Sequence, residues 1–367
     1  MRILFGMPDP DSLGGPIACE PPFVEELRQR DVDVAQMTYV YGESTSPVTT
    51  IDRVRRVLRT AKALRSEAKE FRPDVIHLNT AFDRRAVMRD AAVLRYLSGV
   101  GAKIFLKLHG SDLDLLQRPP VKFRPLINAV LSRADGIGLL SSEELDAFRN
   151  AGVGAEKLFQ LSNVVGEFHP SGDASDVRRE LGIAGDVALL LFIARFIPAK
   201  GLLDAIRAVA ILRDRGRDVH LACVGDGEQR AEAEREVGRL GLQANVTFTG
   251  YIPESEASRF YEAATMLVFP TYHFEGFPMV LFRSAAAGLP IITTRIRAAA
   301  DYLIEPNNCL WTPAKDPAAL AAKIEKLLDS PHLRSEMSSN NRRLATRFSA
   351  SALADEYLDI YHRLIAR

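Results

Sequence analysis

Short apolar runs, rich in branched side chains, alternate along this chain with segments of helical periodicity. The alternation is typical of a parallel sheet with helices on both faces, because each strand must reach the next through a crossover helix. We predict five strands in each half of the chain, at residues 2–6, 32–39, 75–78, 103–108 and 136–139, and then at 188–194, 219–224, 246–249, 266–269 and 290–293. The predicted fold class is α/β, with two doubly wound, Rossmann-like parallel sheets.

Two further segments organise the chain. Residues 162–173 are rich in turn formers and lack periodicity, so we place the boundary between the halves there. Ser349 is suited to cap a last helix, whose apolar face would carry Leu353, Tyr357, Ile360, Tyr361 and Leu364. The predicted domains are residues 1–165 and 166–348, followed by a closing helix at 349–367.

The composition excludes several protein classes. The chain has 367 residues, of which 47% are hydrophobic and 26% charged, enough for two domains with separate cores. Its net charge of zero gives no general attraction to nucleic acid, so no nucleic-acid partner is expected. The cysteines follow no metal-ligand spacing, and we predict that Cys19, Cys223 and Cys309 are buried thiols in a reducing compartment.

The sequence indicates neither secretion nor a membrane span. The first residues become polar too soon for a signal peptide, and the longest apolar run, residues 187–194, is too short to cross a bilayer. We therefore expect a cytoplasmic protein.

Two loops that follow predicted strands could bind phosphate. Arg195 and Lys200 lie between the strand at 188–194 and a helix that begins near residue 202. There an arginine fork and a lysine charge suit a pyrophosphate, with two solvated loop cations as the alternative. Gly14 and Gly15 follow the first strand and would let the backbone approach an oxyanion, with a plain tight turn as the alternative.

A third candidate is Glu275-Gly276-Phe277-Pro278, which opens a short apolar helix ending at Gly288. The carboxylate can accept hydrogen bonds from sugar hydroxyls, while the N–H groups at the helix start can hold an anion. His109 follows the strand at 103–108 and could bond a hydroxyl or move a proton, although a structural histidine is the alternative.

A dehydrogenase is poorly supported. Gly225-Asp226-Gly227 follows a predicted strand but lacks the third glycine of a dinucleotide fingerprint.

The order of these motifs resembles that of the family-4 retaining glycosyltransferases of GT-B fold. The resemblance covers nearly the whole chain and is strongest from Arg195 to about Pro313. It implies two Rossmann-like domains that face a central cleft. The first would bind the acceptor, the second the nucleotide-sugar donor, and the last helix would pack back toward the first domain.

The resemblance also implies a role for each matching residue, in a site without a metal or another cofactor. Arg195 and Lys200 would hold the donor diphosphate and stabilise it as it leaves. Glu275 would bind hydroxyls of the donor sugar, and His109 would help to position its reacting end. The donor's sugar or phosphate would be approached by the backbone of Gly14, Gly15, Gly276 and Phe277. The acceptor hydroxyl would attack on the face that the phosphate leaves, so no protein nucleophile is expected.

Two positions depart from the family pattern. The family usually has a second glutamate, which binds the ribose hydroxyls, where this chain has Arg283, and a guanidinium only donates hydrogen bonds. Relatives often carry glycines in the loop after the strand at 290–293, where this chain has residues 295–300, Arg-Ile-Arg-Ala-Ala-Ala. Arg297 could replace a backbone contact to phosphate, or it could only cap the helix or pair with Asp301.

The acceptor-binding half carries a hidden excess of positive charge. Residues 51–107 contain fourteen Lys or Arg and six Asp or Glu. Within them one helical stripe is apolar and flanked by Arg53, Arg56, Arg59 and Lys62, and it consists of Ile51, Val54, Val57, Leu58, Ala61, Leu64 and Ala68. The pattern is typical of a surface helix packed on its sheet, and also of a helix that lies on anionic lipid. The second alternative predicts a peripheral enzyme that meets a lipid-linked or glycan acceptor at the inner face of the membrane.

Three functions remain open. The first is a retaining glycosyltransferase that extends a cell-surface polysaccharide or glycolipid. The second is a catalytically silent sugar-nucleotide-binding or partner subunit, to which Arg283 points. His109, Arg195, Lys200 and Glu275 favour the first, because a silent subunit has no chemical need for all four. The third, a GT-B epimerase acting on a nucleotide sugar, would need an acid-base cluster that the sequence does not show.

Overall fold

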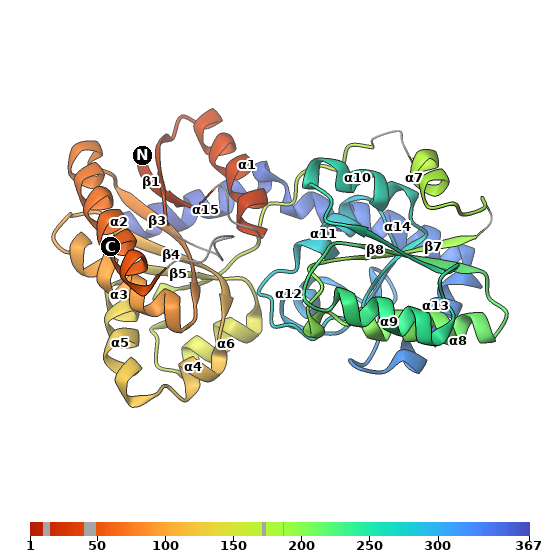
Figure 1. Ribbon diagram of the computed structural model, residues 1–367. Coiled ribbons are helices and arrows are strands. Elements are labelled where there is room, and N and C mark those ends of the chain that lie inside the picture. The colour runs from red at the N-terminus through yellow and green to blue at the C-terminus, as the bar shows by residue number, and fades with distance from the viewer. Residues whose placement is uncertain (10–14, 40–48, 171–173, 186) are drawn as a thin grey trace. The chain divides into compact units, whose positions relative to one another are not determined.

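The polypeptide forms two compact units, each built on a parallel sheet of six strands (Figure 1). The computed structural model describes residues 1–9, 15–39, 49–170, 174–185 and 187–367. The first unit comprises Met1–Val164, Phe274–Phe277 and Phe348–Arg367, and the second comprises Val165–His273 and Pro278–Arg347. The short segment Phe274–Phe277 therefore belongs to the first unit although the chain on either side of it belongs to the second.

The sheet of the first unit has the strand order β2-β1-β3-β4-β5-β6. Its strands are β1 (Arg2–Met7), β2 (Asp33–Thr38), β3 (Val75–Phe82), β4 (Lys103–Ser111), β5 (Gly136–Leu139) and β6 (Leu158–Gln160). Successive side chains of a strand point to opposite faces. Ile76 and Ile104 accordingly join one core cluster, whereas His77 and Phe105 contact each other on the other face.

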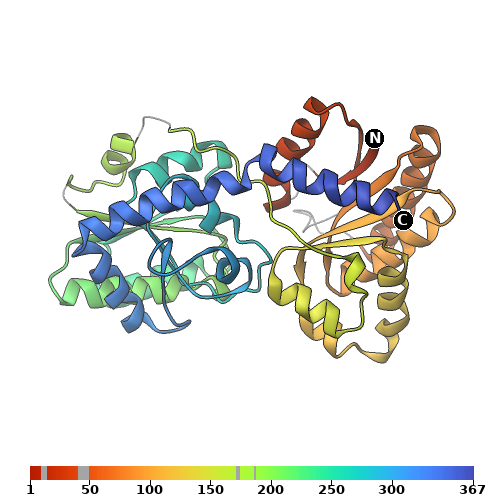
Figure 2. The ribbon, with the colours of Figure 1, turned by 180° about the vertical axis from the view of Figure 1, so that it is seen from behind.

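Helices cover both faces of this sheet. On one face, α3 (Arg84–Leu97) packs against α2 (Thr50–Phe71) and α5 (Arg124–Arg133). On the other, α1 (Gly15–Gln29) packs against α15 (Ala350–Ile365), which runs along the sheet in Figure 2. The remaining α-helices of this unit are the short α4 (Leu113–Gln117) and α6 (Ser142–Asn150) among the described residues.

The last helix confirms the prediction made for its segment. The Ser349 hydroxyl accepts a hydrogen bond from the N–H of Ala352 at 3.2 Å, and all five residues of the predicted apolar face are buried. Two of these residues also make polar contacts. The Tyr357 hydroxyl donates to the carbonyl of Ser162 at 3.3 Å, and the Tyr361 hydroxyl lies 2.5 Å from Nδ1 of His77. The helix is therefore an integral layer of the first unit.

The sheet of the second unit has the strand order β12-β11-β10-β7-β8-β9. Its strands are β7 (Ala188–Ile193), β8 (Val219–Val224), β9 (Val246–Gly250), β10 (Met266–Phe269), β11 (Ile291–Thr293) and β12 (Cys309–Trp311). One helical layer contains α8 (Leu202–Asp214), α9 (Arg230–Leu240) and α13 (Pro317–Leu328), and the other α7 (Ala174–Glu180), α10 (Glu254–Ala263), α11 (Met279–Ala286) and α14 (Pro331–Ala345) (Figure 1). The short α12 (Arg297–Tyr302) follows β11.

The ten strands expected from the sequence are present, and two more were missed. These two, β6 and β12, are edge strands of three residues each. The predicted end of β4 at residue 108 was wrong, because the strand continues through His109 to Ser111 and pairs with Phe82 of β3. His109 thus lies on a strand.

The three cysteines are free and buried, as predicted. Among the helices in the described part of the chain, none combines the length and apolarity that a bilayer crossing needs.

Candidate functional site

The loops that follow three adjacent parallel strands of the second unit lie at the same edge of its sheet. Strand β10 pairs with β7 on one side and with β11 on the other. The loop after β7 carries Arg195 and Lys200, the loop after β10 carries His273, and α12 after β11 begins with Arg297. The carboxyl edge of a parallel sheet is where ligands bind in open α/β folds.

Hydrogen bonds join these three loops. The N–H of Tyr272 donates to the carbonyl of Ala199 at 2.8 Å, and the Thr271 hydroxyl donates to the same carbonyl at 3.3 Å. The Thr294 hydroxyl in turn donates to the carbonyl of Thr271. The β7 and β11 loops are thus both attached to the β10 loop, and their side chains are held in one place.

Glycines make the close packing of these loops possible. Gly201, with φ +78°, lies so near β10 that an added Cβ would stand 2.5 Å from the carbonyl oxygen of Pro270. Gly225 has φ +133°, and a Cβ there would stand 1.9 Å from the carbonyl oxygen of Ala194. The segment that lacked a dinucleotide fingerprint therefore supports the loop that carries Arg195, a role that the sequence analysis did not assign.

Lys200 is a buried cation in this loop cluster. Its side chain is 4% exposed, and its Nζ lies 5.5 Å from the centre of the Phe269 ring. Burial, and then the positive charge of Arg195, lower the pKa of Lys200 to about 7. Arg195 itself is exposed. A bound anion would offset both the lost hydration of Lys200 and its repulsion from Arg195.

The pKa of His273 is affected by the same positive charges. Burial lowers its pKa to about 4, with further lowering by the charges of Lys200, Arg195 and Arg297. The imidazole is therefore neutral at physiological pH. Three cations that act on one histidine make this edge attractive to a multiply charged anion.

Arg283 lies on α11 of the second unit. That helix begins after Pro278, which is its N-cap, and Gly288 follows it with φ +76°, so both predicted boundary residues have their expected places. Arg283 is half-buried on this helix.

The segment Phe274–Phe277 brings Gly276 next to His109 within the first unit. A Cβ on Gly276 would stand 3.2 Å from the carbonyl oxygen of His109 and 3.1 Å from Cβ of Leu140, so a larger residue would displace the segment. Phe277 anchors it, with its ring centre 5.4 Å from that of Phe348. Glu275 is half-buried beside these anchors.

The remaining predicted glycines lie at the start of the first helix. Gly15, which the sequence placed before the helix, is the first residue of α1. Gly14 lies outside the described residues.

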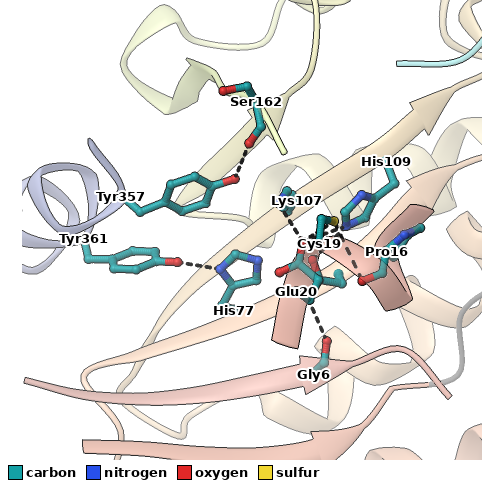
Figure 3. A network of polar contacts seen from close by, with 11 residues as sticks. Gly6, Pro16, Cys19, Glu20, His77, Lys107, His109, Ser162, Tyr357 and Tyr361 are labelled. Carbon is teal, nitrogen blue, oxygen red and sulfur yellow. Dashed lines mark hydrogen bonds and ion pairs between the residues drawn. The ribbon is translucent and has the colours of Figure 1, made fainter. Parts of the chain in front are cut away.

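His109 is held by a buried network on the face of the sheet that α1 and α15 cover (Figure 3). Its Nε2 lies 2.8 Å from Oδ1 of Asn79, whose Nδ2 donates to the carbonyl of Gly6 at 3.2 Å. Because this second bond orients the amide, Oδ1 accepts and His109 carries its proton on Nε2. Burial, and then the charges of Lys107 and His77, hold the pKa of His109 well below 6.5, so the ring is neutral.

A buried ion pair lies beside this histidine. Nζ of Lys107 is 2.6 Å from Oε1 of Glu20, with side-chain exposures of 2% and 0%. Burial lowers the pKa of Lys107, but the Glu20 carboxylate, together with Tyr357 and Cys19, outweighs burial and the net shift is upward. His77, on β3, contacts Tyr361 and belongs to the core.

Cys19, Glu20 and His109 offer potential metal ligands whose atoms lie within 4.8 Å of one another. Figure 3 shows, however, that Lys107 points at the same carboxylate. An ammonium 2.6 Å from Oε1 already neutralises Glu20 and would repel a divalent cation at that oxygen. We therefore assign this carboxylate to Lys107.

Asp112 and Asp114, which resemble a metal-binding pair in the sequence, have a different role. Oδ1 of Asp112 accepts from the N–H of Leu115 at 3.0 Å and caps α4, while Asp114 lies in the first turn. The pair thus serves the start of a helix.

Two family models together match most of the chain. The model of the glycosyl transferases group 1 matches residues 173–344, and that of the glycosyl transferase 4-like domain matches residues 10–163. The chain belongs to the family-4 glycosyltransferases of GT-B fold. In this glycosyltransferase the group 1 match contains the cation cluster, and the 4-like match contains the His109 network.

Curated relatives are similar over part of the glycosyltransferase. The lipopolysaccharide core biosynthesis glycosyltransferase LpsD of Rhizobium meliloti is 32% identical over 206 residues, which are 56% of this chain and 58% of that protein. The alpha-D-kanosaminyltransferase of Streptomyces kanamyceticus is 25% identical over 290 residues, 75% of this chain and 74% of that one. The match thus spans little more than half of LpsD.

Solved structures share the fold over almost the full length. HepE of Anabaena, crystallised with UDP-glucose, superposes with a TM-score of 0.77 at 20% identity and covers 98% of each chain. WaaG, a glycosyltransferase involved in lipopolysaccharide biosynthesis, gives a TM-score of 0.69 at 19% identity over 98% of this chain and 99% of that one. At these identities the likeness concerns the GT-B fold alone.

Proposed function

We propose that this glycosyltransferase is a retaining enzyme that moves a sugar from a nucleoside diphosphate sugar to a glycan or glycolipid in cell-surface polysaccharide biosynthesis. The buried Lys200 beside Arg195 carries this proposal, because that pair suits a leaving diphosphate better than any neutral ligand. The similarity to LpsD supports the acceptor class, and the UDP-glucose bound to HepE supports the donor class.

Each residue has one task in the proposed reaction. Arg195 and Lys200 bind diphosphate oxygens and stabilise the charge that develops as the bond to the anomeric carbon breaks. The acceptor oxygen bonds to that carbon on the same face, and its proton passes to an oxygen of the leaving diphosphate. Glu275 binds donor hydroxyls. His109 is neutral, so it positions the reacting end without adding positive charge. The reaction needs neither a protein nucleophile nor a metal.

Donor turnover tests the proposal. We expect hydrolysis, and transfer to a glycan acceptor, with at least one sugar derivative from a panel of UDP, GDP, ADP, CMP and dTDP donors, and a product whose anomeric configuration by NMR matches that of the donor. An inverted product would refute the retaining mechanism.

A catalytically silent sugar-nucleotide-binding subunit is the second candidate, because Arg283 stands where the family usually has a ribose-binding glutamate. Normal binding without turnover of any donor would favour it. If Arg283 contacts the nucleoside, Arg283→Glu should change the order in which the nucleotides raise the melting temperature, and an unchanged order would exclude that contact.

Exposed apolar and basic side chains on the N-terminal half of α2 support the proposal of a peripheral contact with an anionic membrane. Ala61, Leu64 and Ala68 of the predicted apolar stripe are buried, but Ile51, Val54 and Leu58 are 64%, 54% and 38% exposed. Arg53, Arg55 and Arg59 are exposed on the same half of the helix. Exposed apolar side chains interspersed with cations suit a surface of anionic lipid, where a lipid-linked acceptor would lie.

Vesicle binding tests this part of the proposal. At low salt we expect more protein on phosphatidylserine-containing vesicles than on neutral ones, and a loss of that difference in the double variant Ile51→Ser, Leu58→Ser. Val121→Ser is the matched control, because Val121 is 78% exposed in the same unit but outside α2. Equal binding to both kinds of vesicle would refute the membrane contact.

A further inference from the structure

Asn79 is a buried amide on β3, beside His109 on the neighbouring strand β4. Its side chain has no exposed surface, and the residue pairs in register with Lys107, two positions before His109, so the three side chains lie on the same face of the sheet. An amide in the protein interior is unfavourable unless its oxygen and its nitrogen are both hydrogen-bonded. Oδ1 lies 2.8 Å from Nε2 of His109, and Nδ2 donates to the carbonyl of Gly6 at 3.2 Å. Asn79 therefore connects β1 to the histidine through its two ends.

The position of this amide decides where the imidazole carries its proton. Nε2 of His109 has two oxygens nearby, Oδ1 of Asn79 at 2.8 Å and Oε1 of Glu20 at 3.5 Å. The longer distance is at the limit of a hydrogen bond, and Oε1 already accepts from Lys107 at 2.6 Å. Asn79 is thus the main acceptor for the Nε2 proton. In a neutral imidazole the other nitrogen is an acceptor, so any hydroxyl that reaches the ring at Nδ1 has to donate to it.

The residue that Asn79 holds also packs against the segment that carries Glu275. A Cβ on Gly276 would stand 3.2 Å from the carbonyl oxygen of His109, so this carbonyl and the segment are in close contact within the first unit. A shift of His109 would therefore disturb a second predicted sugar-binding residue as well. Small displacements of this kind lower reaction rates because the reacting groups lose their alignment.

We propose that Asn79 is a positioning residue for sugar transfer, which acts through His109 by holding its imidazole in one orientation with the proton on Nε2. This role rests on the proposed function, since His109 is assigned there to the reacting end of the donor. A fully buried amide acts on the reaction through its neighbour and not by contact with the donor.

A matched pair of variants separates this role from a general need for a buried amide. Asn79→Leu and Asn79→Asp both remove the NH2 group that donates to Gly6, but only Asn79→Asp keeps an oxygen that can accept from His109. With the sugar nucleotide that the wild-type protein hydrolyses fastest, kcat should fall about tenfold to a hundredfold in Asn79→Leu. Asn79→Asp should retain most of kcat, and KM for the donor should change less than kcat. Asn79→Ala takes the place of Asn79→Leu if the larger side chain prevents folding.

Nitrogen NMR of the histidine rings measures the proton position without any turnover. We expect Nε2 of His109 to be protonated in the wild-type protein and in Asn79→Asp, and an Nδ1–H form to appear in Asn79→Leu.

A double-mutant cycle tests whether Asn79 acts through the ring. In a protein that already carries His109→Ala, the further change Asn79→Leu should not lower kcat again. Thr80→Val is the control, because Thr80 is also fully buried on β3 but donates to Asp90 at 2.6 Å. It should lower the melting temperature and leave kcat unchanged.

Several outcomes would overturn the role. Equal losses of kcat in Asn79→Leu and Asn79→Asp, or a further loss in the double variant, would refute it and leave the proposed function intact. An Nδ1–H ring in the wild-type protein would do the same. A wild-type protein that hydrolyses no donor would refute the proposed function and this role with it, whichever nitrogen carries the proton.

Discussion

Each unit of this glycosyltransferase buries a lysine near the carboxyl end of a parallel strand, and the two lysines have opposite chemistry. Lys107 of β4 is 2% exposed and Lys200, after β7, is 4% exposed. The pKa of Lys107 is raised because Glu20 lies 2.6 Å from its Nζ, whereas the pKa of Lys200 is lowered to about 7 by burial and by Arg195. Burial alone therefore does not decide the state of a lysine.

The difference distinguishes the charge of Lys107, which has a structural role, from that of Lys200, which we propose binds a ligand. Lys107 is compensated within the protein, and with Glu20 it surrounds His109 with a rigid, fully buried network. Burial and the charge of Arg195 disfavour the charged form of Lys200, and under the proposed function a bound diphosphate would favour it. The buried lysine of the first unit thus has a fixed charge, whereas that of the second has a charge that can respond to a ligand.

Removal of the first lysine should give the largest effect. Lys107→Met leaves Glu20 buried without its countercharge, and we expect the free energy of unfolding in urea to fall by about 3–5 kcal/mol. Lys103→Met is the control on the same strand, because Lys103 and Asp135 are 30% and 37% exposed and 3.9 Å apart, and its cost should stay below about 1 kcal/mol. Similar losses in the two variants would mean that the buried pair has no special importance.

Removal of the second lysine should affect binding and spare stability. Lys200→Met keeps the apolar stem but removes a charge that is unfavourable in the empty site, so the free energy of unfolding at pH 7 should not fall. Nucleoside diphosphate affinity, measured by calorimetry, should fall about tenfold to a hundredfold. Lys323→Met, which removes a lysine paired with Glu305 at 3.0 Å, should leave that affinity unchanged. A marked loss of stability in Lys200→Met would break the contrast between the two lysines.

The contrast also predicts how donor binding depends on pH. A bound diphosphate raises the pKa of Lys200 from about 7, so above that pH binding takes up a proton and affinity decreases as pH rises. Calorimetry in buffers of different ionisation enthalpy would measure the uptake, which should approach one proton well above pH 7 and disappear in Lys200→Met. No uptake in the wild-type protein would place the lysine outside the phosphate site.

The same pKa sets the sign of the pH effect on the ligand-free protein. The folded pKa of Lys200, about 7, lies below its usual 10.5, so between these values the unfolded chain binds more protons and the contribution of Lys200 to stability rises with pH. The raised pKa of Lys107 has the opposite sign, because its contribution is fully present below 10.5 and is lost only as pH rises through the higher folded pKa.

The smallest expected effect concerns His109. Because burial and the charge of Lys107 hold its pKa well below 6.5, its ring should show no titration by NMR from about pH 6 to 8, with the proton on Nε2 throughout. Titration of His109 near neutral pH would contradict the rigid frame of the first unit.

The local sequence was sufficient for much of the fold. Apolar runs located ten of the twelve strands, and the Ser349 cap with its apolar face located the last helix, because these signals lie within a few neighbouring residues. The same periodicity was ambiguous for α2, where burial of Ala61 and exposure of Ile51 depend on how far the underlying sheet and α3 extend.

Motifs in the sequence located Arg195, Lys200, His109 and Glu275, but their states depend on residues that only folding brings close. Lys107 and Lys200 look alike in the sequence, and they differ because one meets a carboxylate 87 positions away and the other meets a cation in its own loop. The sequence by itself determined the elements and the family, whereas the tertiary structure determined the charges, because a pKa is set by neighbours in space.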